Sequence, residues 1–81
     1  MFEFLSQEAL NKTVGKNIKK YRYKYNIEKE PMNQRELAKL VGVSTSTIGS
    51  LESNKSGQGV SVYNLYKISK VLDAPIESFF E

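Results

Sequence analysis

The residues of this chain that could take part in chemistry are hydroxyls, carboxamides and charged groups. Its 81 residues include no Cys and no His. This excludes internal disulfides, zinc fingers, cysteine nucleophiles and Ser-His-Asp triads, because each requires a thiolate or an imidazole. The nine acidic residues are scattered, without a paired-carboxylate motif or a glycine-rich phosphate loop. The sequence therefore predicts no enzyme activity, no metal site and no cofactor.

Two segments stand out by their chemistry, one rich in hydroxyls and one rich in positive charge. Residues 44–50, STSTIGS, are small and uncharged, and they offer hydroxyls that both donate and accept hydrogen bonds. Residues 12–26 carry six basic side chains and no acid, in a chain whose net charge is +3. Such a basic segment favours a polyanionic partner, although a solvated lysine-rich helix face explains the same charges.

Helical periodicity dominates the elements that must position these segments, and no strand pattern is convincing. We expect five helices, over about residues 14–25, 34–41, 45–53, 62–72 and 75–81. The predicted N-caps, whose side-chain oxygens accept orphan backbone N–H groups, are Thr13, Asn33, Ser44 and Ser61. The first two helices are expected to end at Asn26 and Gly42. Pro31 keeps the link over residues 27–32 extended.

The length and composition fit one small globular domain, with 40% hydrophobic and 26% charged residues. We expect residues 1–13 to form an N-terminal extension and residues 14–81 to form the domain. No apolar run approaches the roughly 18 residues needed to span a membrane, and the N-terminus has acids where a signal peptide needs positive charge. We therefore expect a cytoplasmic protein that does not associate with membranes.

Residues 34–53, QRELAKLVGVSTSTIGSLES, form two short helices around a glycine turn. This segment resembles the helix-turn-helix of the lambda-repressor/Cro (XRE-type) family, and the resemblance extends over about residues 14–80. The alternative is an ordinary helical hairpin in a small bundle. The resemblance implies an all-α, five-helix lambda-repressor-like DNA-binding domain. The residues that carry the motif are Leu37, Ala38, Gly42, Val43, Ile48 and Leu51.

The resemblance also implies an ion pair and a set of DNA contacts. Arg22 and Glu52 fall at positions that the family pairs in a partly buried ion pair; the alternative is two unrelated exposed charges. Residues at the start of the recognition helix would meet base edges in the major groove, whereas on sequence alone they form a solvated, well-capped helix start. The residues so implicated are Ser44, Thr45, Ser46, Thr47 and Ser50.

Contacts to the DNA backbone are implied on both sides of the motif. Gln34 matches a family glutamine that contacts a phosphate, and Arg35 is expected to add a flanking contact. The segment after the recognition helix touches the opposite backbone in this family, and it offers Lys55, Ser56 and Gln58. The alternatives are a capping residue for Gln34, an exposed charge for Arg35 and a flexible polar loop for the last three.

Two features depart from the family pattern. The leading face of the recognition helix has no Arg, Lys, Gln or Asn, so the strong bidentate contacts to bases, worth about 1–3 kcal/mol each, are missing there. Specificity would then depend on methyl contacts, water or DNA shape. The link over residues 27–32 is longer than the family usually needs, and its acids place it away from DNA.

The favoured function is a sequence-specific regulator that binds double-stranded DNA as a homodimer, acting as a repressor by occlusion. Two apolar groups could form the dimer, one at each end of the chain: Phe2, Phe4 and Leu5, and Ile76, Phe79 and Phe80. The first group could equally fold back on its own domain. The alternative function is an antitoxin-like protein-interaction module, and a regulatory protein partner fits either function. A single-stranded nucleic-acid binder would need exposed aromatic side chains in a basic groove.

Overall fold

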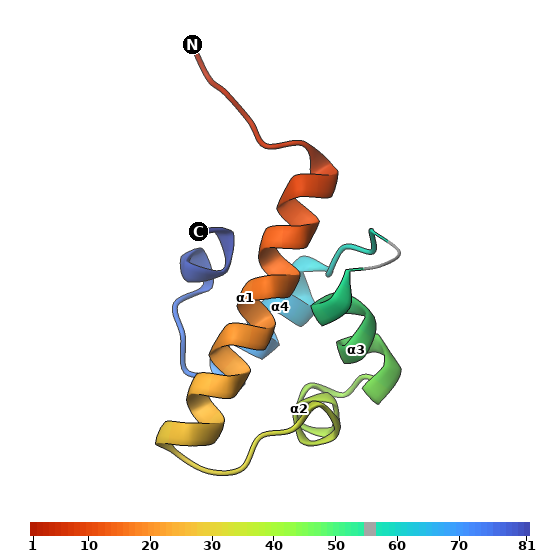
Figure 1. Ribbon diagram of the computed structural model, residues 1–81, viewed down its shortest axis with the longest axis vertical. Helices are drawn as coiled ribbons and strands as arrows, with labels where there is room; N and C mark the ends of the chain where they lie inside the picture. The colour runs from red at the N-terminus through yellow and green to blue at the C-terminus, as the bar shows by residue number, and fades with distance from the viewer. Residues whose placement is uncertain (55–56) are drawn as a thin grey trace.

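Helix α1 (Gln7–Glu28) forms the long axis of the molecule in a computed structural model that describes residues 1–54 and 57–81. It packs against α3 (Thr45–Ser53) on one side and against η1 (Ile76–Phe80) on the other (Figure 1). Helix α2 (Gln34–Val41) contacts α3 and α4 (Val62–Val71). The described residues contain helices and no strand, which confirms the all-α helix-turn-helix fold.

Helix α1 is longer than predicted at both ends. It begins at Gln7 because Ser6 is its N-cap, with Ser6 Oγ accepting from the Ala9 N–H at 3.0 Å. The predicted start after Thr13 is therefore wrong. The predicted end at Asn26 is also wrong: Asn26 lies within the helix, and its side-chain oxygen accepts from the Met32 N–H at 2.6 Å.

The bounds of α2 and α3 are as predicted, because both caps and the turn act locally. Asn33 Oδ1 accepts from the Glu36 N–H at 2.7 Å, and Ser44 Oγ accepts from the Thr47 N–H at 3.1 Å. Gly42 has a φ of 87°, in the left-handed region where glycine carries no steric cost. Its N–H donates to Ala38 O at 2.8 Å. This turn fixes the angle between the two helices.

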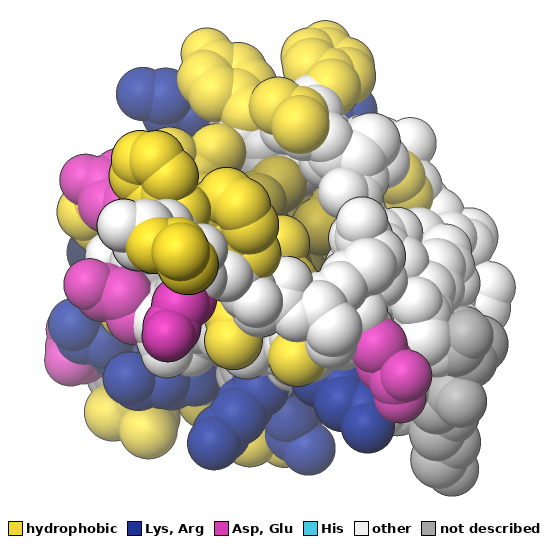
Figure 2. All heavy atoms as spheres, turned by 90° about the horizontal axis from the view of Figure 1, so that it is seen from above, with side chains coloured by type: hydrophobic (Ala, Val, Ile, Leu, Met, Phe, Trp, Pro, Cys, Tyr) yellow, Lys and Arg dark blue, Asp and Glu magenta, His cyan; other side chains and the backbone are white. Residues whose placement is uncertain are grey.

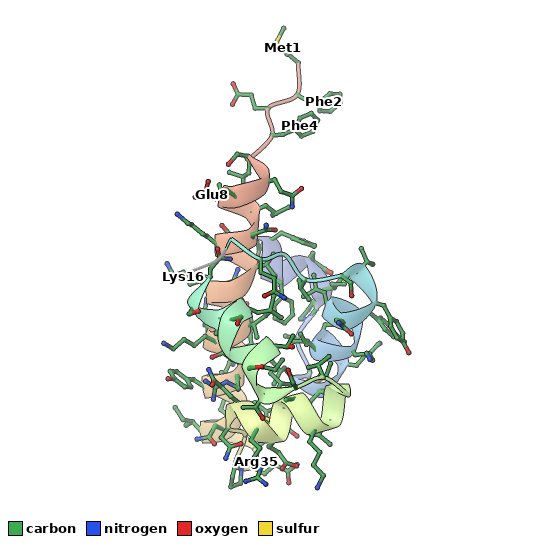
Figure 3. All side chains as sticks on the ribbon, turned by 90° about the vertical axis from the view of Figure 1, so that its right-hand side faces the viewer. Met1, Phe2, Phe4, Glu8, Lys16 and Arg35 are labelled. Carbon is green, nitrogen blue, oxygen red and sulfur yellow. The ribbon has the colours of Figure 1, made fainter. Side chains whose placement is uncertain are left out.

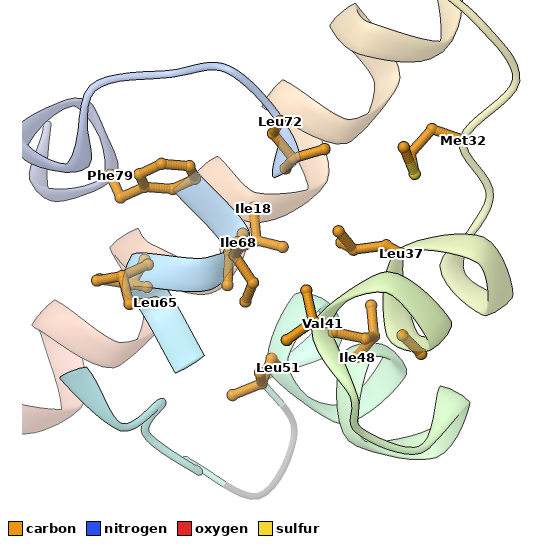
Figure 4. Packing of buried hydrophobic residues seen from close by; sticks show 12 residues of the cluster. Ile18, Met32, Leu37, Val41, Ile48, Leu51, Leu65, Ile68, Leu72 and Phe79 are labelled. Carbon is orange, nitrogen blue, oxygen red and sulfur yellow. The ribbon is translucent and has the colours of Figure 1, made fainter. Parts of the chain in front are cut away.

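One apolar core joins all five elements (Figure 4). Its innermost side chains come from α1, α2, α3, α4 and η1 in turn, and each is 0% exposed: Ile18, Leu37, Ile48, Ile68 and Phe79. Burying a side chain of this size contributes about 1.5–3 kcal/mol. Met32, from the link between α1 and α2, is also buried. The core therefore fixes the motif helices on α1.

The chain ends differ from the sequence-based expectation. The predicted fifth α-helix is a 3₁₀ helix, η1, and Pro75 precedes it instead of lying in its first turn. The Phe79 ring packs edge-on against Tyr21, with centroids 5.2 Å apart. Residues 1–6 extend away from the body of the molecule (Figure 1), and the Phe2 and Phe4 side chains are exposed. Among the described residues, none of the helices combines the length and the apolar character that a bilayer crossing requires.

Candidate nucleic-acid interface

The start of α3 presents a hydroxyl cluster that is held by its own hydrogen bonds. Ser44 Oγ shares hydrogen bonds with Thr47 Oγ1 at 2.8 Å and with Ser46 Oγ at 3.1 Å. Ser44, Thr45 and Ser46 are exposed and Thr47 is half-buried. Because Ser44 also caps the helix, the cluster is fixed relative to the backbone N–H groups at the helix start. Its hydroxyls are therefore ordered, and they lie on the outside of the molecule.

The outer face of α3 carries no charge along its length. Ser50 is half-buried one turn beyond the cluster, and Ser53 Oγ donates to Ser50 O at 3.3 Å. In Figure 3, α2, α3 and the start of α4 face the viewer with α1 behind, and Arg35 lies at the lower edge. In Figure 2, the side on which α3 lies is mostly uncharged, whereas Lys and Arg gather along a neighbouring edge. The one charged residue of α3, Glu52, is buried, so the outer face of this helix is uncharged.

Gln34 lies against α3 at the start of α2. Its Nε2 donates to Glu52 Oε1 at 3.0 Å. A Cβ built on Gly49 would lie 3.6 Å from Gln34 Oε1, an ordinary van der Waals distance. The carboxamide is therefore oriented by α3, beside the free N–H groups of the first turn of α2. Such a helix start favours an anion.

The structure brings Arg22 and Glu52 together in the interior. Arg22 Nε and Nη2 donate to the two carboxylate oxygens at 2.7 and 2.9 Å, and Nη1 donates to Met32 O at 3.1 Å. The exposed fractions of the two side chains are 7% and 2%. The hydrogen bond to Glu52 raises the pKa of Arg22, so the guanidinium stays charged. The pair connects α1, the link and α3, and through Glu52 it also holds Gln34.

The remaining predicted contact residues divide into two groups. Arg35 and Gln58 are exposed. Lys55 and Ser56 lie outside the described residues.

Among the motif residues, Leu37, Ala38, Ile48 and Leu51 are buried, and Val43 is half-buried against the core. Gln34 lies beside α3 near Gly49 and Glu52, while Arg35 is exposed on α2 and the hydroxyl cluster is exposed at the start of α3.

Sequence reasoning missed two residues that position this surface. Gly15 brings the backbones of α1 and α3 together: a Cβ there would lie 2.0 Å from Leu51 O. An isolated glycine inside a helical pattern was the available signal, since it usually has a packing reason. Asn11 Nδ2 donates to Gly57 O at 2.9 Å, after α3. No local pattern could indicate that bond, because it joins residues far apart in the sequence.

The lysines of α1 form an exposed basic edge beside this surface. Lys16, Lys19, Lys20 and Lys24 are exposed, and Lys12 makes a surface pair with Glu8 at 3.4 Å. Exposed pairs of this kind contribute little to stability. The positive charge is therefore available for long-range attraction of a polyanion.

Comparisons with known proteins show the family of this chain. Residues 24–79 match the family described as helix-turn-helix. Two proteins from Archaeoglobus fulgidus, each named an uncharacterized HTH-type transcriptional regulator, are similar to the chain over 63 residues. One is 43% identical, over 78% of this chain and 79% of the relative; the other is 41% identical, over 78% and 80%. The chain therefore belongs to the lambda-repressor/Cro-like (XRE-type) helix-turn-helix family.

Proposed function

We propose that this protein is a sequence-specific transcriptional regulator that binds double-stranded DNA, with α3 in the major groove and the start of α2 against a phosphate. One observation carries the proposal: the hydroxyl cluster at the start of α3 is exposed and held by its own hydrogen bonds, while Gln34, at the start of α2, is oriented by Glu52 of α3. In this motif the N-terminal residues of the second helix meet base edges and the first helix lies across the backbone. Family membership supports the same placement.

The hydroxyl cluster suits a particular kind of base reading. Thr45 offers a hydroxyl and a methyl group, and a threonine methyl packs against the methyl of thymine. Without charged or amide side chains on this face, each base contact is weaker than a bidentate one, so sequence-dependent DNA shape supplies part of the discrimination. The basic edge of α1 provides sequence-independent attraction.

The same proposal includes a homodimer that represses by occluding its operator. One domain of this size covers a single half-site, and a two-fold dimer would bind half-sites about 34 Å apart. Support comes from the exposed apolar side chains at the two ends of the chain, Phe2, Phe4, Leu5 and Phe80. Exposed apolar groups on this scale are typical of an interaction surface.

Those same apolar side chains also favour a second candidate, an antitoxin-like module whose main contact is another protein. Salt separates the two functions. Binding to DNA weakens steeply as the salt concentration rises, because each neutralised phosphate releases counterions. The logarithm of the binding constant falls with the logarithm of the salt concentration, with a slope of about −0.9 for each phosphate contact. Binding through the apolar chain ends would change little.

The test is selection of bound duplexes from a random DNA pool, followed by titration of the recovered duplex and a scrambled one. We expect Thr45→Ala to reduce the discrimination between them by about fivefold, because it removes a base contact. Gln34→Ala should weaken binding to both duplexes equally, as loss of a phosphate contact does. Thr13→Ala, the same change on α1, is the control. The absence of any bound duplex at low salt would contradict the proposed function.

A further inference from the structure

The first two turns of α1 lie against the residues that follow α3, although the two segments are far apart in the sequence. Asn11 Nδ2 donates to Gly57 O at 2.9 Å in a part-buried contact. Gln7 Nε2 donates to Asn11 Oδ1 at 3.1 Å. The Asn11 side-chain oxygen accepts the hydrogen bond from Gln7. The NH₂ group of Asn11 is therefore directed at Gly57. The amide of Asn11 is thus held from both sides.

The backbone of residues 57–59 fits closely around this amide. A Cβ built on Gly59 would lie 3.0 Å from Asn11 Oδ1, tighter than most real contacts. Gly57 has a φ of 69°, a conformation that other residues rarely adopt. Gly57 therefore suits the left-handed backbone, and a side chain at Gly59 would push the Asn11 amide aside by a few tenths of an ångström.

The same face of α1 also holds the end of α3. Gly15 lies one turn after Asn11, and positions four apart share a helix face. A Cβ at Gly15 would lie 2.0 Å from Leu51 O and 3.6 Å from Asn54 Nδ2. Helix α1 therefore contacts the last turn of α3 and the segment after it as one continuous surface.

We propose that Asn11, oriented by Gln7, is a positioning residue that holds residues 57–59 in the conformation that contacts the DNA backbone. This rests on the proposed function and deepens it, because the family resemblance implies that the segment after the recognition helix, with Gln58, meets the opposite DNA backbone. Gln58 is exposed between the two glycines and supplies the contact. Ordering a free backbone on binding costs conformational entropy, and a segment already held avoids that cost.

The experiment compares Asn11→Ala with Asn17→Ala. The two asparagines lie on the same helix, and each donates from Nδ2 to a backbone carbonyl at 2.9 Å, but Asn17 bonds Phe79 O in η1, on another side of α1. Affinity is titrated for the selected and scrambled duplexes at a temperature where circular dichroism shows both variants folded. Hydrogen exchange of the Gly57 and Gly59 amides is measured on the free proteins. Gln7→Ala, at an exposed position, is the third variant.

We expect Asn11→Ala to weaken binding by about fivefold to both duplexes, with discrimination unchanged and faster exchange at Gly57 and Gly59. Gln7→Ala should give a smaller loss in the same direction, and Asn17→Ala should leave affinity within about twofold. Equal losses in Asn11→Ala and Asn17→Ala, or unchanged affinity in Asn11→Ala, would overturn the positioning role while the proposed function stands. If the unaltered protein binds no duplex, the proposed function itself fails.

Discussion

Among the described residues, two ion pairs tie α1 and the residue after it to distant parts of the chain, and the two pairs differ sharply in solvent exposure. Arg22 and Glu52 are nearly inaccessible to solvent, with exposed fractions of 7% and 2%. Lys29, which follows α1 as its C-cap, and Asp73, which follows α4, are exposed by 45% and 73%. A buried pair whose partner is removed leaves an uncompensated charge in the interior, whereas water replaces an exposed partner at little cost. Removing one partner should therefore lower the free energy of unfolding far more at the buried pair between α1 and α3 than at the exposed pair.

The largest expected effect comes from removing one member of the buried pair. Glu52→Ala leaves the Arg22 guanidinium without its carboxylate and frees Gln34, and we expect the free energy of unfolding to fall by about 3–5 kcal/mol. Chemical denaturation followed by circular dichroism measures it. The double variant Arg22→Met, Glu52→Leu is the control, and it should lose less because no charge remains buried. A loss below about 1 kcal/mol in Glu52→Ala would mean that the pair behaves as an exposed one.

A smaller effect is expected at the backbone contact between α1 and α3. Gly15→Ala places a Cβ 2.0 Å from Leu51 O, so α1 and α3 must separate. Overpacking of this kind costs about 1–3 kcal/mol, which outweighs the gain of up to about 1 kcal/mol that alanine brings to a helix. Gly49→Ala is the matched control, since its nearest contact is an ordinary 3.6 Å. Thermal unfolding should show Gly15→Ala less stable and Gly49→Ala at least as stable as the unaltered protein; the reverse order would contradict the close approach.

The smallest effect is expected at the exposed pair, and it depends on pH. The hydrogen bond from Lys29 lowers the pKa of Asp73 below its ordinary 3.8, and the same bond raises the pKa of Lys29 above its ordinary 10.5. A carboxyl whose pKa is lowered by folding stabilises the fold at pH values above its pKa in the unfolded state. That contribution is lost as the pH falls through its pKa in the folded state. A raised lysine pKa stabilises below its unfolded-state value and is lost as pH rises through the folded value. The pair therefore contributes between about pH 4 and pH 10.5.

Asp73→Asn tests this dependence. Asparagine tolerates the left-handed backbone that Asp73 adopts, with a φ of 54°. Unfolding midpoints measured from pH 2 to pH 8 should show the unaltered protein slightly more stable at neutral pH and the two proteins converging at the acid end. Parallel curves across the whole range would show that the pair contributes nothing to the pH dependence.

The helices of the motif could be predicted because their ends are encoded locally. Asn33, Gly42 and Ser44 each form a hydrogen bond with a backbone group within five residues. Both partners of each bond therefore lie in one short segment of the sequence. The start of α1 is not specified locally in the same way. Ser6 and Thr13 can both serve as N-caps, so the local sequence leaves two possible starts. Its first turns persist because Leu10 packs on the core and Asn11 bonds Gly57. Tertiary contacts thus decided between two locally equivalent starts.

The sequence alone could name the residues of the candidate site, which remain predictions, but not the hydrogen bond that joins Gln34 to Glu52. The family resemblance implied a phosphate contact for Gln34 and, as a separate feature, an ion pair between Arg22 and Glu52. The structure joins them in one network, because the Glu52 carboxylate accepts from both Gln34 and Arg22. Met32 shows the same limit: it lies in a link without periodicity, and its burial depends on how α1 and α2 come together. Such connections arise from the packing angle between helices, which no single segment specifies.

The uncharged outer face of α3 has a consequence for how this regulator would find its operator. Five exposed lysines lie on α1 and the exposed Arg35 lies on α2, while the residues that would read bases are neutral. Under the proposed function, sequence-independent ionic attraction and discrimination between sequences would then come from different helices. Raising the ionic strength should then shorten the lifetime of the complex with any duplex, while the order of affinities among different sequences stays the same. Selectivity and the lifetime of the complex could therefore be changed independently, by evolution or by design.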